Sequence, residues 1–153
     1  MPGQAATIGS MHVCPMCTGT VPHVGGPISG PGSPNVLIGG KPAAIMGDMC
    51  VCSGPPDTIA QGESTVLING KPAVTVGALT AHGGTISVGE PTVLIGTGAS
   101  TPTAIMALEK IPFPKITITN HLLSNTKEAQ ANQEKLRDES KKQGRLGQFN
   151  ISF

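Results

Sequence analysis

Aromatic residues are almost absent from this chain of 153 residues. It contains three Phe, no Trp and no Tyr, and charged residues make up only 12% of it. A core built from Val, Ile, Leu, Ala and Met buries little area per residue, and full burial of one Val or Leu contributes roughly 1.5–3 kcal/mol. Chains rich in Gly also lose extra backbone entropy on folding. A small body of this composition usually needs a disulfide, a metal or a partner to be stable.

Other features are missing as well. No apolar stretch approaches the roughly 18 residues that a membrane-spanning helix needs. No basic segment precedes an apolar run at the start, so no ordinary signal peptide is visible. We therefore expect a protein that is held in the cytoplasm during assembly and exported, without a signal peptide, to the extracellular space or a target cell. The net charge of +1 is too mild to indicate a nucleic-acid partner.

The composition changes near Gly98. Residues 1–97 hold 18 of the 21 Gly and 11 of the 14 Pro, whereas all three Phe and eight of the ten basic residues lie beyond that point. This change predicts a first domain over residues 1–97 and a C-terminal extension over residues 98–153.

A short sequence motif repeats within the first domain. Val36–Ala43 reads VLIGGKPA, Val66–Ala73 reads VLINGKPA, and the motif begins again as VLIG at Val93–Gly96. Self-similarity at a spacing of about 30 residues indicates repeated supersecondary units that share one core. Three such units predict a body with approximate threefold symmetry, suited to a threefold partner.

Each unit reads as a strand, a Gly-Lys-Pro turn and a second short strand that ends at Gly. Gly at a positive φ and Pro at a fixed φ are typical of hairpin turns. The segment Ala5–Gly9 matches the second half of a unit whose first half is missing. The strand at 93–96 can complete that unit and close the ring without a free edge. We therefore predict an all-β, small, conical body of short strands.

The extension has a different pattern. Ile116–Thr119 alternates and predicts a strand, and Asn125–Gln143 predicts a helix with Glu128 in its cap and Gly144 at its end. A helix this polar is expected to be solvated, marginal or ordered by a partner. The ending Phe149–Phe153 suits either a strand added to another sheet or a frayed tail.

Cysteine and histidine occupy equivalent positions in the units. Cys14, Cys52 and His82 each lie five residues beyond the Gly that ends a unit, and His12 and Cys50 each lie three residues beyond it. Equivalent positions should converge at one end of a threefold axis. Four thiolate or imidazole groups meeting there would suit tetrahedral Zn²⁺.

Plainer interpretations of the same residues stay open. Cys14 and Cys17 form a C-x-x-C pair, which is typical of redox motifs and of half a zinc site, but no thioredoxin-like pattern surrounds it. Structural disulfides are not expected in a cytoplasmic chain. Two of the four Cys are expected to be small buried hydrophobes, since one zinc needs only four ligands. His121 in the extension is expected to be an ordinary surface residue.

Several motifs, in order, resemble those of the PAAR-repeat proteins. They are the opening Met11–Met16, the segment Pro22–Ile28, the GGKPA and NGKPA turns, the segment Cys52–Asp57 and the segment Thr80–Ile86. The resemblance covers residues 3–97. It implies a small β cone that caps the trimeric VgrG-type spike of a contractile injection apparatus, as in type VI secretion systems and their phage-like relatives. It also implies one tip per trimer and only mechanical contact with the target membrane.

The resemblance further implies a structural zinc near the apex, held by three His and one Cys. Carried over by position, the ligands are His12, His23, Cys52 and His82. A competing set replaces His12 with Cys14, which the pseudo-symmetry favours. Cys17 and Cys50 depart from the family pattern, so the site can be richer in thiolate than the family implies.

Two functions from different classes follow. The first is a structural tip protein, not an enzyme, that can anchor effector or cargo proteins. The second is a specialised effector whose residues 98–153 form a small toxin delivered on the spike. The extension has one His, no Cys and no recognisable nucleophile–base pair, which favours docking or cargo binding over catalysis. A free-standing zinc enzyme with a reactive Cys14 or Cys17 is disfavoured, because four protein ligands leave no position for water.

Overall fold

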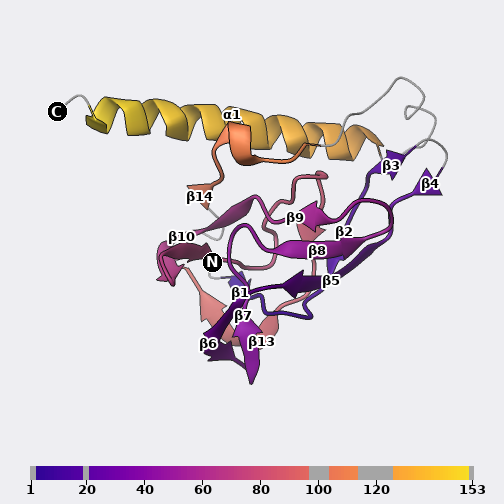
Figure 1. Ribbon diagram of the computed structural model, residues 1–153, viewed down its shortest axis with the longest axis vertical. Coiled ribbons are helices and arrows are strands. Elements are labelled where there is room, and N and C mark those ends of the chain that lie inside the picture. The colour runs from indigo at the N-terminus through magenta and orange to yellow at the C-terminus, as the bar shows by residue number, and fades with distance from the viewer. Residues whose placement is uncertain (1–2, 19–20, 97–103, 114–125, 152–153) are drawn as a thin grey trace.

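Short strands build the N-terminal body of the protein, and one long helix lies at its C-terminal end (Figure 1). The computed structural model describes residues 3–18, 21–96, 104–113 and 126–151. The predicted all-β body with a helix in its extension is confirmed. No helix among these residues has both the length and the apolar character needed to span a bilayer.

The elements follow one another along the chain with little intervening loop. The strands are β1 (Gly3–Ala5), β2 (His12–Val13), β3 (Cys17–Thr18), β4 (Val21–Pro22), β5 (Gly25–Gly30), β6 (Ser33–Ile38), β7 (Lys41–Ala43), β8 (Met49–Cys52), β9 (Asp57–Thr58), β10 (Gln61–Ile68), β11 (Lys71–Ala73), β12 (Thr85–Ile86), β13 (Glu90–Ile95) and β14 (Ala104–Ile105). A 3₁₀ turn, η1 (Leu108–Lys110), and the helix α1 (Thr126–Ile151) complete the described structure.

Three antiparallel pairs carry the repeat. β6 pairs with β7, β10 pairs with β11, and β13 pairs with β1. Their registers are equivalent, since Ile38 faces Lys41, Ile68 faces Lys71, and Ile95 faces Gly3. The last strand of the body therefore completes the unit that the N-terminal strand begins, as the sequence predicted.

The two continuous hairpins turn through residues with positive φ. Gly39 and Gly40 have φ of 58° and 81°, and Asn69 and Gly70 have φ of 53° and 79°. Positive φ at both central residues is the geometry that matches the twist of a two-residue hairpin. Figure 1 shows β6, β7 and β13 gathered at the end of the body away from α1. We call this the hairpin end.

Backbone hydrogen bonds close a ring around the pseudo-threefold axis. The Ala6 N–H donates to Val74 O at 2.8 Å, Val74 N–H to Ala44 O at 3.2 Å, and Ala44 N–H to Ala6 O at 3.0 Å. These three residues are at most 1% exposed. Further along, three equivalent bonds form within the units, where Gly9, Gly47 and Gly77 each donate to the carbonyl of the next central isoleucine at 2.9 Å. The units are thus tied to one another through main chain as well as side chains.

Two small aliphatic clusters surround this ring. One contains the three equivalent isoleucines Ile28, Ile59 and Ile86, each at most 1% exposed. The other, toward the hairpin end, contains Ile38, Ile68 and Ile95. No aromatic residue belongs to either cluster. The central alanines leave too little room for one without displacing the ring.

The extension packs against the body. β14 adds to β10 through Gln61 opposite Ile105, and α1 places Leu136 in a third cluster with Leu79 and Ile111. The predicted end of the helix at Gly144 is wrong, because α1 continues to Ile151. That helix also includes residues 149–151, so the added strand predicted there does not form. The strand predicted at 116–119 lies outside the described residues.

Truncating a central isoleucine should test this core. Ile59 is fully buried, so Ile59→Ala should lower the free energy of unfolding by about 2–5 kcal/mol, measured by denaturant titration. Leu67→Ala is the control, because Leu67 is 61% exposed and should change it by no more than about 0.5 kcal/mol. Equal effects of the two substitutions would place Ile59 outside the core.

Candidate metal centre

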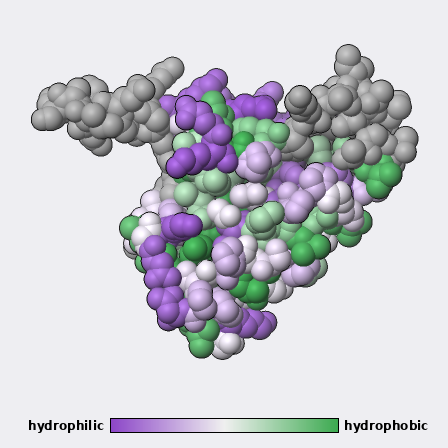
Figure 2. Space-filling view, in the orientation of Figure 1, coloured by the Kyte–Doolittle hydropathy of each residue, from purple (hydrophilic) through white to green (hydrophobic). Residues whose placement is uncertain are grey.

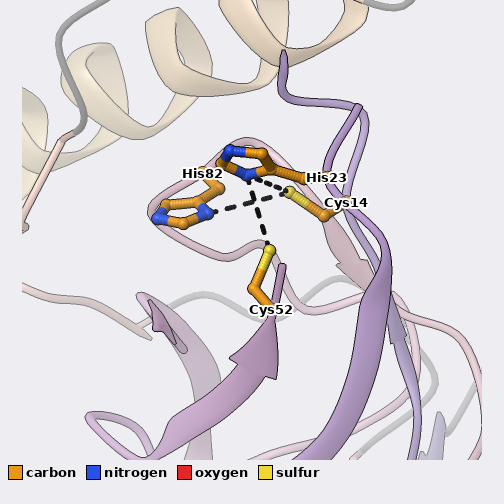
Figure 3. Close-up of side chains that lie close together, drawn as sticks. All are labelled: Cys14, His23, Cys52 and His82. Atoms are coloured by element: carbon orange, nitrogen blue, oxygen red, sulfur yellow. Dashed lines mark hydrogen bonds between the residues drawn. The ribbon is translucent and has the colours of Figure 1, made fainter. Parts of the chain in front are cut away.

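Four ligand-bearing side chains meet at the α1 side of the body. They are Cys14, His23, Cys52 and His82, and their ligand atoms all lie within 4.8 Å of one another (Figure 3). Three of them occupy the equivalent position five residues beyond Gly9, Gly47 and Gly77, so the expected convergence of these positions is observed. The fourth, His23, comes from the segment between β4 and β5.

The distances within this group are short and similar. Cys14 Sγ lies 3.7 Å from Nδ1 of His23 and 3.7 Å from Nδ1 of His82, and Cys52 Sγ lies 3.5 Å from His23 Nδ1. His23, Cys52 and His82 are buried, and Cys14 is half-buried. Two sulfurs and two Nδ1 atoms therefore point at one small volume, as Figure 3 shows. This group could hold a metal ion.

The protonation states suit ligand binding. Burial lowers the pKa of His23 and of His82, so both imidazoles are neutral, which is the form that binds metal. Burial raises the pKa of Cys14 and of Cys52, so both thiols keep their protons when no cation is present. A metal ion must displace those protons, and its binding should strengthen as pH rises.

His12, which the resemblance assigned as a ligand, lies outside this group of four. Its Nδ1 is 2.9 Å from the carbonyl oxygen of Gly26, and its Nε2 is 3.4 Å from Asp57 Oδ2. The ring is 2% exposed and sits on β2, where the neighbouring Val13 faces solvent. The structure thus places together the alternative set, in which Cys14 replaces His12.

Asp57 organises a buried polar network behind the four side chains. Its Oδ1 accepts from the backbone N–H of His82 at 3.0 Å and of Thr58 at 2.8 Å, and its Oδ2 accepts from the Thr80 hydroxyl at 2.5 Å. His12 Nε2 approaches Oδ2 without the alignment of a hydrogen bond, so that contact is electrostatic.

The charges of this network support one another. Burial opposes ionisation of Asp57, but His12, His82 and Thr80 together lower the pKa of the Asp57 carboxyl. Burial likewise opposes a charge on His12, but Asp57 and the Gly26 carbonyl raise the pKa of that imidazole. Asp57 fixes the backbone of His82 through its hydrogen bond to the His82 N–H. The sequence analysis did not identify this contact of His12 and His82 with Asp57. The Cys-x-Gly-Pro-Pro-Asp spacing contained Asp57, but nothing in the spacing showed what it would contact.

The other two cysteines lie outside the group of four. Cys50 is fully buried in the central aliphatic cluster, and Cys17 is 3% exposed on β3. Within the described residues, none of the four cysteines forms a disulfide. Cys50 thus packs as a small hydrophobe, as expected for part of the cysteine set. His121 lies outside the described residues.

Metal content should distinguish the two candidate ligand sets. Cys14→Ser should reduce bound metal well below about one ion per chain, because it removes a thiolate from a four-ligand site. His12→Asn should leave the metal content near that of the unaltered protein. Elemental analysis of the folded, purified variants makes the comparison. Metal lost from His12→Asn and kept by Cys14→Ser would restore the His12 set.

Removing the carboxylate of Asp57 should destabilise the body. Asp57→Ala leaves His12 buried beside no charge and three donors without their acceptor, at a cost of about 3–5 kcal/mol in the free energy of unfolding. Asp138→Ala on the exposed side of α1 is the control and should cost no more than about 0.5 kcal/mol. A cost for Asp57→Ala as small as the control's would contradict the network.

Comparison with known proteins finds a family match within the repeat-containing body. A sequence model of the PAAR motif matches residues 18–88, which span β4 to β12. No curated protein matches the chain. The matched region contains the hairpins β6–β7 and β10–β11 and three of the four clustered side chains. Over these residues the chain carries the PAAR motif.

Proposed function

We propose that this protein is the structural tip of a contractile injection apparatus, such as a type VI secretion system, and that it caps a trimeric VgrG-type spike. The observation that carries the proposal is the set of three equivalent strand pairs around one axis, in a chain that matches the PAAR motif. A body with three similar faces can contact all three subunits of a trimer at once. Because its three units are joined in one chain, one copy caps one trimer.

The hairpin end supplies a suitable contact surface. Leu37, Leu67 and Leu94 occupy equivalent positions, and their exposed fractions are 61%, 61% and 57%. Figure 2 shows hydrophobic patches among hydrophilic ones at this end of the molecule. Three exposed leucines in equivalent places are what a threefold apolar partner would cover.

The same hairpins also carry polar and charged groups. Asn35 and Asn69 exchange side-chain hydrogen bonds of 3.1 and 2.7 Å between neighbouring units. Lys41 and Lys71 are equivalent to each other, whereas Gly3 stands in the third unit. Because a symmetric trimer offers three equivalent rotations to a tip with unequal units, the extension or a cargo would mark which rotation is used.

The metal in the proposal is zinc. Tetrahedral Zn²⁺ with Zn–S of about 2.3 Å and Zn–N of about 2.0–2.1 Å separates a sulfur from a nitrogen by about 3.5–3.6 Å. The distances from the Cys52 and Cys14 sulfurs to the histidine Nδ1 atoms, 3.5, 3.7 and 3.7 Å, are close to that separation. When bound, zinc would join three chain segments at an end of the body that has little room for a hydrophobic core.

The proposed role is mechanical and not enzymatic. Four protein ligands would fill a tetrahedral zinc and leave no position for a reacting water. The tip would assemble in the cytoplasm and leave the cell with the spike. Effector or cargo proteins would be carried with the tip. The tip would contact the target membrane only mechanically, by piercing it.

Binding to the spike tests the proposal. Leu37→Asp with Leu67→Asp should weaken binding to a purified VgrG-type trimer from the same cells at least about tenfold, because two charges would be buried in an apolar contact. Val21→Asp with Val88→Asp is the control, since these residues are 61% and 52% exposed outside the hairpins. Calorimetry gives affinity and stoichiometry. No binding by the unaltered protein, or more than one copy per trimer, would reject the proposal.

A further inference from the structure

The turn that carries His82 lies between the metal group and α1. Cys52 ends strand β8 and Cys14 directly follows β2, so the sheets of the body hold the backbone on one side of each. His82, in contrast, lies in the turn of residues 81–83, outside every strand. Of the three equivalent ligand positions, this one has the least support from regular structure in the described body.

The helix supplies that support from outside. Asn132 Nδ2 donates to the carbonyl oxygen of Gly83 at 2.7 Å, and Gln133 Nε2 donates to the carbonyl oxygen of Ala81 at 3.1 Å. These two carbonyls flank His82 in the chain. Gln133 is 1% exposed, so its amide is committed to this contact. Backbone carbonyls of a tight turn need partners, and here side chains of α1 provide them.

Close packing accompanies these hydrogen bonds. Gly83 has φ of 85°, and a Cβ there would collide with the carbonyl group of Ala129. Ala129 itself is fully buried, and Leu136 packs with Ala81 in the third aliphatic cluster. The backbone of α1 at Ala129 therefore lies against the backbone of the turn at Gly83, with no room for a larger side chain at Gly83.

Inside the molecule, the same turn is held by different contacts. The backbone N–H of His82 donates to Asp57, and its Nδ1 faces Cys14 Sγ. The turn is thus held on its inner side by Asp57 and the group of four ligand side chains, and on its outer side by α1. Figure 3 shows the helix running past the four side chains.

We infer that α1 is a positioning element of the metal centre, and that Asn132 and Gln133 hold the turn so that His82 Nδ1 faces the other three ligands. The inference rests on the metal site of the proposed function and concerns the extension, which the PAAR match does not cover. It follows that metal binding and docking of α1 stabilise one another. Each event orders the same turn, and linkage between two binding equilibria is reciprocal.

Zinc affinity of the full-length protein tests the inference. Asn132→Ala with Gln133→Ala should lower the affinity about tenfold, measured by competition with a chromophoric chelator. Glu134→Ala with Lys135→Ala is the matched control, because both residues are exposed on the next positions of the same helix. The control should bind zinc within about twofold of the unaltered protein. Circular dichroism verifies that each variant keeps its fold.

A second variant disturbs the contact without touching the amide donors. Ala129→Leu should force α1 away from Gly83 and lower zinc affinity in the same direction. With Co²⁺ in place of zinc, both the double variant and Ala129→Leu should change the visible absorption of the site, which a purely distant loss of stability would not do. Removing zinc from the unaltered protein should in turn speed cleavage of α1 by a protease.

The outcomes separate the two claims. Unaltered zinc affinity and Co²⁺ spectra in both variants would overturn the inference and leave the zinc site intact. Cleavage of α1 that is independent of zinc would overturn the linkage. If the unaltered protein takes up no zinc, the metal part of the proposed function falls together with the inference, whereas binding to the spike is measured separately.

Discussion

The ring of three backbone hydrogen bonds among Ala6, Ala44 and Val74 is the constraint on which the rest of the structure depends. Three segments can donate to one another around an axis only if their side chains are small, and each unit accordingly has Ala immediately before its ring residue. This explains why the body has no aromatic residue: the space near the axis is filled by main chain. Each unit contributes one equivalent isoleucine to the cluster of Ile28, Ile59 and Ile86 and one to the cluster of Ile38, Ile68 and Ile95.

The axis also determines where the ligands meet. After each ring residue the chain passes a Gly with positive φ, and the residues five positions beyond these three glycines lie close together. Strict threefold symmetry would supply three ligands, but a tetrahedral site needs four. His23, from the longer connection in the first unit, is the fourth. For the zinc of the proposed function, this departure from symmetry would supply the fourth ligand.

The sequence predicted the repeat, the closure of the ring by residues 93–96 and the convergence of positions 14, 52 and 82, because each follows from counting along equivalent units. It did not decide between His12 and Cys14, since that choice depends on the buried Asp57 that His12 meets. The docking of α1 was also missed. Its buried positions 129, 133, 136 and 140 have helical spacing, but Gln133 and Ser140 conceal the stripe. Their partners are carbonyls of Ala81 and Met106, and no local pattern shows that those carbonyls lie nearby.

The three units have the same fold, but they differ in whether their strand edges can pair with an added strand such as β14. β14 pairs with Gln61 and Gly62 at the start of β10, and the position equivalent to Gln61 in the first unit is Pro31, which has no N–H to donate. In the third unit the equivalent residue is Val88, whose N–H already donates to Met11 O at 3.3 Å. The extension therefore has one compatible edge, and that edge leads it to the turn of His82 and away from the hairpin end (Figure 1). The extension packs away from the hairpin end. A spike could therefore bind the hairpin end while α1 stays packed on the turn of His82.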